Sequence, residues 1–208
     1  MTMKNEGPDA KEPVALRSDV FTVANVLSFF RILLVPLFLW SILNGLSAKA
    51  LLIFCVAAVT DLLDGFAARL WHQRSRLGTV LDPAGDKLLV ATSYVVLTIP
   101  SLASPNHIPL WLTVTVFVRD LLIVGGALFA FLTWRQKTFM PSFLGKISTG
   151  CQVGMIFLVL LSNYRVAVPW YMAWTYWITL FWTLVSGVHY LIYGLAVLRS
   201  RRKSSTIT

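Results

Sequence analysis

Six long apolar stretches, separated by short segments rich in Gly, Pro, Asn or basic residues, run through most of the chain. Each has roughly the 20 residues that an α-helix needs to cross the hydrocarbon core of a bilayer. The turn signals between them predict helices over the approximate ranges 21–43, 48–70, 82–100, 110–134, 143–164 and 168–198. The third begins at the segment DPAGDK, where Asp82 suits the cap and Pro83 the first turn of a helix.

The composition supports a membrane protein. Of the 208 residues, 57% are hydrophobic and 13% are charged, whereas soluble domains carry about 25% charged residues. We therefore expect an all-α integral membrane protein with a polar N-terminal tail (1–20), a six-helix domain (21–198) and a basic C-terminal tail (199–208). The two cysteines, Cys55 and Cys151, lie in apolar segments and give no sign of a disulfide framework.

The basic residues alternate along the predicted loops. One set of tails, loops and loop edges is rich in them, while the opposite loops hold only Lys49 and Arg165. The rich set contains Lys4, Lys11, Arg17, Arg69, Arg74, Arg76, Arg135, Lys137, Lys146, Arg199, Arg201, Arg202 and Lys203. Because positive residues concentrate on the cytoplasmic side, both termini are predicted in the cytosol. Topology and attraction to anionic lipid then explain the net charge of +9, and no nucleic-acid partner is expected.

The acidic residues are distributed very unevenly. Four of the nine lie in the N-terminal tail, and the apolar domain holds the other five: Asp61, Asp64, Asp82, Asp86 and Asp120. An ionisable residue inside a membrane span costs roughly 2.5–3.5 kcal/mol and usually has a function. The positive-inside assignment places the first four at one cytosolic level, where two neighbouring helices end and begin.

The spacing of these four aspartates predicts a metal site. Asp61 and Asp64 are three residues apart and Asp82 and Asp86 are four apart, so each pair occupies one helical face. Four converging carboxylates would repel one another at low dielectric, and divalent cations are the natural counter-charge. An all-oxygen ligand set favours one or two Mg²⁺ or Mn²⁺ ions, which suit phosphoryl transfer.

The same residues belong to a longer motif. Asp61-x2-Asp64-Gly65-x2-Ala68-Arg69-x8-Gly78-x3-Asp82-x3-Asp86 resembles, at every fixed position, the signature of the CDP-alcohol phosphatidyltransferase family. The resemblance implies transfer of a phosphatidyl group from CDP-diacylglycerol to an alcohol with release of CMP. It also implies a polar cavity open to the cytosol, and a homodimer.

The resemblance further implies roles for the motif residues. Asp61, Asp64, Asp82 and Asp86 would bind the metals, and Asp86 would also act as the base on the acceptor hydroxyl. The CDP-lipid site would be lined by Gly65, Ala68, Arg69 and Gly78, with Arg69 contacting phosphate.

Four further polar residues are candidates for binding the acceptor: Arg31, Arg119, Lys146 and Thr149. Three cations converging beside the metals would favour a phosphorylated acceptor. Open alternatives are a topology-setting role for Lys146, and for Arg119 an ion pair with Asp120 or Asp86. A similar structural role is the alternative for Arg31.

The identity of the acceptor alcohol is less determined. The segments NVLSFFRI and GKISTGCQ resemble the branches that use glycerol 3-phosphate and phosphatidylglycerol, while VRDLLIVGGALF departs from the former. Glycerol 3-phosphate, giving phosphatidylglycerol phosphate, is the first candidate. Phosphatidylglycerol, the acceptor of a cardiolipin synthase, is the alternative; inositol phosphate, serine and choline come after them.

Two rival classes have different signatures. A divalent cation transporter would carry its acids near mid-bilayer and would not need Gly65, Ala68 and Arg69 beside them. A non-catalytic scaffold would tolerate loss of an aspartate, and none is lost here. We expect an enzyme of phospholipid synthesis in a bacterial inner membrane, with its site facing the cytoplasm.

Overall fold

The computed structural model describes the backbone of residues 23–71, 78–103, 105–134 and 143–204. Side chains are described for 29–61, 87–103, 105–126, 143–192 and 194. Six helices account for most of the described residues: α1 (Val23–Leu43), α2 (Ser47–Trp71), α3 (Gly78–Thr98), α4 (Leu110–Trp134), α5 (Phe143–Tyr164) and α6 (Met172–Ser204). The described residues form no strand, and the predicted all-α class is confirmed.

Three of the predicted helix limits are wrong by at least four residues. Helix α3 begins at Gly78 rather than Asp82, so Asp82 lies inside the helix and does not cap it. A start one turn earlier is tolerated because Pro83 then removes only one backbone hydrogen bond near the N-terminal end. Helix α6 continues past 198 to Ser204, because Arg and Lys are good helix formers that interact favourably with a helix C-terminus.

The start of α6 also differs from the prediction. The segment VPW forms a turn before the helix, in which the Pro169 carbonyl accepts a hydrogen bond from the Met172 N–H. The limits of α4 and α5 agree with the predicted ranges 110–134 and 143–164.

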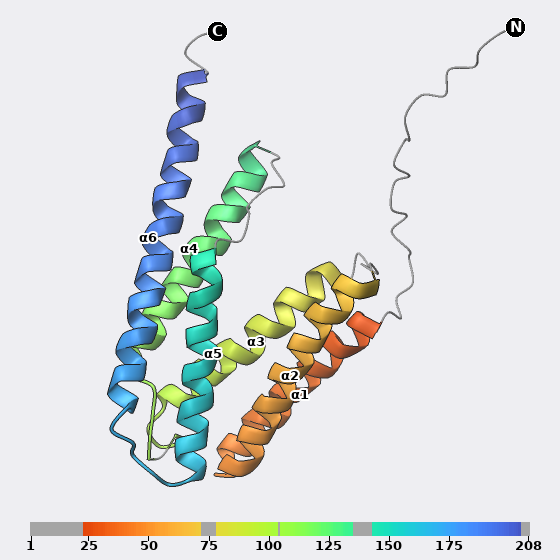
Figure 1. Ribbon diagram of the computed structural model, residues 1–208, viewed down its shortest axis with the longest axis vertical. Helices are drawn as coiled ribbons and strands as arrows, with labels where there is room; N and C mark the ends of the chain where they lie inside the picture. Colours follow the sequence, from red (N-terminus) through yellow and green to blue (C-terminus); the bar gives the residue numbers. More distant parts are fainter. Residues whose placement is uncertain (1–22, 72–77, 104, 135–142, 205–208) are drawn as a thin grey trace, which may run out of the picture.

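The helices pack as two groups. Helix α1 contacts both α2 and α3, whereas α6 contacts both α4 and α5. Contacts of α5 with α2, and of α3 with α4 and α5, join the groups. Figure 1 shows α1 and α2 leaning away from α4 and α6 toward the end where α1 begins and α6 finishes. The ends of α2 and α4 and the starts of α3 and α5 lie toward this same end.

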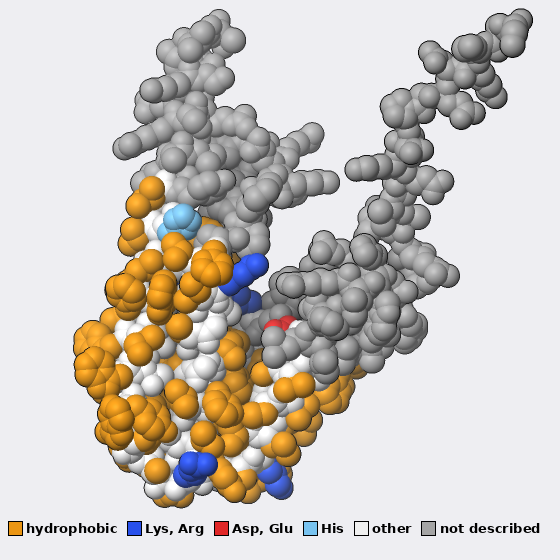
Figure 2. All heavy atoms as spheres, in the orientation of Figure 1, with side chains coloured by type: hydrophobic (Ala, Val, Ile, Leu, Met, Phe, Trp, Pro, Cys, Tyr) orange, Lys and Arg blue, Asp and Glu red, His pale blue; other side chains and the backbone are white. Residues whose placement is uncertain are grey.

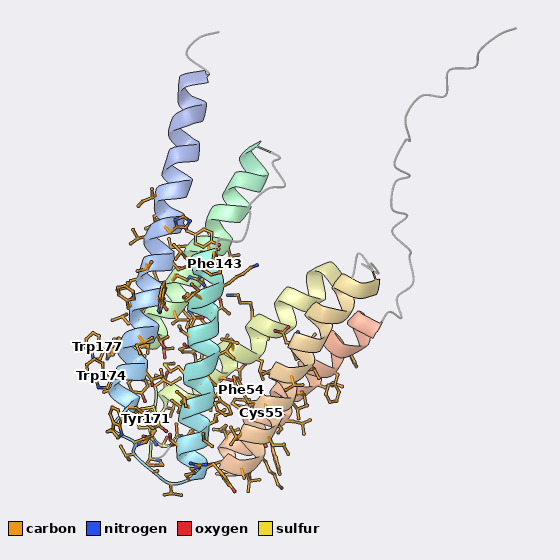
Figure 3. The ribbon with its side chains drawn as sticks, in the orientation of Figure 1. Phe54, Cys55, Phe143, Tyr171, Trp174 and Trp177 are labelled. Atoms are coloured by element: carbon orange, nitrogen blue, oxygen red, sulfur yellow. The ribbon has the colours of Figure 1, made fainter. Side chains whose placement is uncertain are left out.

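Apolar side chains are both inside and outside this bundle. The interior includes Phe38 of α1, whose ring lies 6.4 Å from that of Phe54 of α2, and Met155 of α5. Large exposed apolar side chains nevertheless occur on all six helices, and Figure 3 shows Trp174 and Trp177 pointing away from the bundle. Such a surface is typical of a protein that contacts membrane or partner chains.

Length and hydropathy identify membrane-spanning character most clearly in α5. Within the described residues, Phe143–Tyr164 is the one helix that is long and apolar enough to cross a membrane by these criteria, and Phe29–Leu43 and Lys87–Thr98 are shorter apolar segments. The predicted number of six spans is therefore not established by this test.

The end of the bundle opposite the start of α1 contains a buried polar link. The side chain of Asn163 accepts hydrogen bonds from the backbone N–H and side-chain amide of Asn106, and donates one to the Asn106 carbonyl. Asn106 also donates to the Ala167 carbonyl. This link fixes the α3–α4 connection against the end of α5.

Candidate active site

The eight motif residues are divided between two helices. Asp61, Asp64, Gly65, Ala68 and Arg69 lie in the C-terminal half of α2, and Gly78, Asp82 and Asp86 lie in the first turns of α3. Both helices pack against α1, so one helix holds the two carboxylate pairs in the same group. Of these residues only Asp61 has a described side chain; the predicted contacts of the other seven lie outside the described residues.

Asp61 is paired with a buried arginine. The Nη1 of Arg31 lies 3.4 Å from the Asp61 Oδ1, and the Arg31 side chain is 2% exposed while that of Asp61 is 50% exposed. The carboxylate therefore faces solvent on one side and a fixed positive charge on the other. Burying a guanidinium is favourable only when it is paired, so this interaction explains how α1 carries an arginine in an apolar segment.

The surroundings of Asp61 fit a metal ligand. Its half-exposed carboxylate leaves an oxygen available beyond the ion pair, and Asp64, Asp82 and Asp86 would complete an all-oxygen set of the kind that Mg²⁺ and Mn²⁺ prefer. Within the described part of the chain no three His, Cys, Asp or Glu side chains gather. The metal site therefore stays a prediction.

A second carboxylate, Asp120 of α4, lies between two cations. Its Oδ2 accepts from the Nζ of Lys87 at 2.5 Å, and its Oδ1 accepts from the Nη1 of Arg119 at 2.7 Å. Lys87 directly follows Asp86 in α3. The Lys87–Asp120 ion pair therefore connects the helix that carries one motif aspartate pair with the α4–α6 group.

Arg119 is an anchor of the α4–α6 group. Besides Asp120, it donates to the Ser186 Oγ of α6 at 2.7 Å and to the Gly145 carbonyl of α5 at 3.5 Å. Its side chain is 7% exposed. The ion pair with Asp120 that was left open as an alternative is present, and binding of the acceptor by Arg119 stays a prediction.

The other two candidate acceptor residues lie in the first turns of α5. Thr149 donates to the same Gly145 carbonyl that accepts from Arg119, and Lys146 is adjacent to Gly145 and exposed. Arg119 and Thr149 therefore share one carbonyl, and Lys146 is the sequence neighbour of the residue that carries it. Arg31 lies instead on α1 with Asp61, so the structure divides the four candidates between the two helix groups.

Figure 2 shows a recess between these groups, where basic and acidic side chains of described residues lie close together. Figure 3 places Phe143, the first residue of α5, among the helices α4, α5 and α6, toward the end of the bundle where α1 begins and α6 finishes. The cluster around Gly145, two residues further on, therefore belongs to that end, where α2 finishes and α3 begins.

Two residues with clear roles in this geometry were missed by the sequence reasoning. Lys87 received no role although a lysine in an apolar helix requires a counter-ion, and that requirement was the available signal. Ser186 gave no signal, because a serine in an apolar helix commonly bonds to its own backbone. Its pairing with Arg119 depends on how α4 packs against α6.

Comparison with known proteins identifies the family. Residues 21–185 match the family model described as CDP-alcohol phosphatidyltransferase. The chain belongs to this family, and the predicted family and enzyme class are confirmed.

Three relatives illustrate the range of named activities. The chain is similar to a protein named cardiolipin synthase (CMP-forming) from Homo sapiens, with 32% identity over 86% of this chain and 64% of the relative. A protein of the same name from Streptomyces coelicolor is 38% identical over 69% of this chain and 67% of the relative. A protein from Escherichia coli named CDP-diacylglycerol--glycerol-3-phosphate 3-phosphatidyltransferase is 34% identical over 64% of this chain and 73% of the relative.

The chain thus spans slightly less than two thirds of the human relative's length and about two thirds to three quarters of the two bacterial ones. Both predicted branches are represented among the names of these relatives, one as a cardiolipin synthase and the other as a glycerol-3-phosphate phosphatidyltransferase.

Proposed function

We propose that the protein transfers a phosphatidyl group from CDP-diacylglycerol to an alcohol and releases CMP. The observation that carries this proposal is the placement of the complete aspartate motif on α2 and α3, two helices held by α1. Asp61, the described member of the motif, is half exposed and fixed by Arg31, as a residue that acts on a polar ligand should be. The family membership supports the same reaction class.

The motif aspartates would hold the cofactor. Asp61, Asp64, Asp82 and Asp86 are the residues proposed to bind one or two Mg²⁺ or Mn²⁺ ions. When bound, such ions would neutralise charge that develops on the phosphoryl oxygens. Arg31 would keep the Asp61 carboxylate in place, because its own position is fixed by burial.

In the proposed transfer, Asp86 takes the proton from the acceptor hydroxyl. The acceptor oxygen forms a bond to the β-phosphorus of the CDP-lipid, the bond from that phosphorus to the oxygen shared with the α-phosphate breaks, and CMP leaves with the electron pair. Gly65, Ala68 and Gly78 would leave room for the cytidine diphosphate group, and Arg69 would contact its phosphate.

For the acceptor we propose phosphatidylglycerol, with glycerol 3-phosphate as the second candidate, which reverses the order expected from the sequence. Asp120 neutralises part of the positive charge of Arg119 and Lys87, which fits the single negative charge of a phosphodiester better than the double charge of a phosphomonoester. The two relatives named cardiolipin synthase also match a larger share of this chain. Glycerol 3-phosphate is favoured by the exposed Lys146 at the same site and by the name of the E. coli relative.

We further propose a multi-pass protein of a bacterial inner membrane, with its site at the cytosolic face and a second copy as partner. Three features support the membrane arrangement: the apolar helix α5, the exposed apolar side chains on all helices, and the asymmetry of the basic residues. The aspartate-bearing ends of α2 and α3 lie toward the end at which α1 starts, which is the cytosolic end in the predicted topology.

Release of CMP tests the proposed function directly. Purified full-length protein in lipid nanodiscs receives CDP-diacylglycerol, Mg²⁺ or Mn²⁺, and either phosphatidylglycerol or glycerol 3-phosphate. We expect CMP release that a chelator abolishes and that is faster with phosphatidylglycerol. Faster release with glycerol 3-phosphate would reverse the order of the two acceptors, and no release with any alcohol would refute the transferase proposal.

A further inference from the structure

The strongest feature outside the motif is the carboxylate of Asp120, which lies between the side chains of Lys87 and Arg119. Resting on the proposed function, we propose that Asp120 is a positioning residue that holds the ammonium group of Lys87 on the α4 side, away from the metal-binding aspartates. The ion pair Lys87–Asp120 would thereby keep a positive charge from competing with the divalent cation.

The position of Lys87 in the sequence is the reason to assign this role to the ion pair. It directly follows Asp86 and is five residues after Asp82 in the same helix, so its positive charge lies within about one and a half turns of both positions. A lysine paired with a ligand carboxylate would remove that oxygen from the metal set and repel the metal. In the structure the Lys87 Nζ bonds instead to Asp120, 33 residues further along the chain.

Asp120 is itself fixed for this role. Its other oxygen accepts from Arg119, which Ser186 and the Gly145 carbonyl hold in a buried position. The Asp120 side chain is 20% exposed and that of Lys87 53%, so the better anchored partner is the carboxylate. The lysine is therefore the partner that would move if the pair were broken.

The proposal predicts opposite effects for the two partners. Asp120→Asn can keep an oxygen toward Arg119 while its amide group replaces the acceptor of Lys87. Lys87 then lacks its acceptor, and Mn²⁺ binding should weaken by at least about tenfold, because a like charge free to approach the site repels the cation. Lys87→Met removes the competing charge, so it should leave Mn²⁺ binding unchanged or tighten it.

The decisive variant is the double mutant Asp120→Asn/Lys87→Met, which should bind Mn²⁺ as the wild type does. If the ion pair were purely structural, the double mutant would bind Mn²⁺ as weakly as Asp120→Asn, because removing the second partner would not rescue the loss caused by the first. Lys49→Met is a matched control, since Lys49 lies over the ring of Trp40 and not at this site.

The experiment measures Mn²⁺ binding to the full chain in nanodiscs by electron paramagnetic resonance, with thermal unfolding and CMP release recorded for each variant. Weaker binding in Asp120→Asn and its restoration in the double mutant support the proposal. Wild-type binding in Asp120→Asn, or weak binding that persists in the double mutant, would overturn it. Asp120→Glu, which keeps the charge, should stay near wild type and provides the test if Asp120→Asn does not fold. Absence of both Mn²⁺ binding and CMP release in the wild type would instead refute the proposed function, and this inference with it.

Discussion

Arg31 and Asp61 form an ion pair between α1 and α2, with the guanidinium group buried and the carboxylate half exposed. The arginine thus lies behind the aspartate as seen from solvent. This arrangement suits a residue that orients a metal ligand, whereas the sequence alone left acceptor binding and a structural role for Arg31 both open. The two roles predict different kinetics.

If Arg31 orients Asp61, Arg31→Met should lower kcat about ten- to a hundredfold, as a misplaced catalytic group does. The KM for the acceptor should stay close to that of the wild type, because Arg31 would not contact it. CMP release at varied acceptor concentration measures both constants. An increase in KM with kcat unchanged would support acceptor binding instead.

Asp86→Asn tests the proposed base. An amide cannot take the hydroxyl proton, so turnover should fall by about 10²–10⁴-fold. Binding of CDP-diacylglycerol, followed by isothermal titration in nanodiscs, should be largely kept, because the lipid-binding residues are unchanged. Near-normal turnover would remove Asp86 from this role.

Lys146→Ala tests the cluster at the start of α5. Loss of a charged donor at the acceptor site should raise the KM for a phosphorylated acceptor about tenfold while leaving the KM for CDP-diacylglycerol unchanged. Lys49→Ala, near the opposite end of the bundle, is the matched control because it also removes one lysine from a helix. An unchanged acceptor KM in Lys146→Ala would favour the topology role of this lysine.

Asn163→Ala should destabilise the fold without touching the site. It removes the partners of the backbone N–H and carbonyl of Asn106, a residue that is 5% exposed. Two buried unpaired groups cost about 2–6 kcal/mol together, so the midpoint of thermal unfolding should drop clearly. Activity per folded molecule should be kept; a loss of activity at full stability would show that this end of the bundle acts on the site.

Val166→Gly should stabilise the protein. Helices α1 and α5 end with the same pair of hydrogen bonds, around Gly45 (φ 68°) and Val166 (φ 51°) respectively. This turn requires the left-handed region, which costs a residue with a side chain about 1–2 kcal/mol. The glycine variant should raise the unfolding temperature by about 2–4 °C, measured by scanning fluorimetry, whereas Gly45→Val should lower it.

Local periodicity in the sequence determined the helices and the motif. Apolar stretches and turn residues located α4 and α5 within the chain, and the spacing of Asp61 and Asp64 already placed them on one helical face. Such features depend on residues three or four positions apart, which any helix brings together. The family followed from the same local pattern.

Only the tertiary structure decided which polar side chains from different helices contact one another. Lys87 with Asp120, Arg31 with Asp61 and Arg119 with Ser186 are pairs from different helices, separated by 30 or more residues. Each depends on the rotation and crossing of the helices, which are set by packing of the whole bundle rather than by any local spacing. For this reason the sequence could name Arg31, Asp61 and Arg119 as candidates, but it gave Lys87 no role and could not assign the partners that come from other helices.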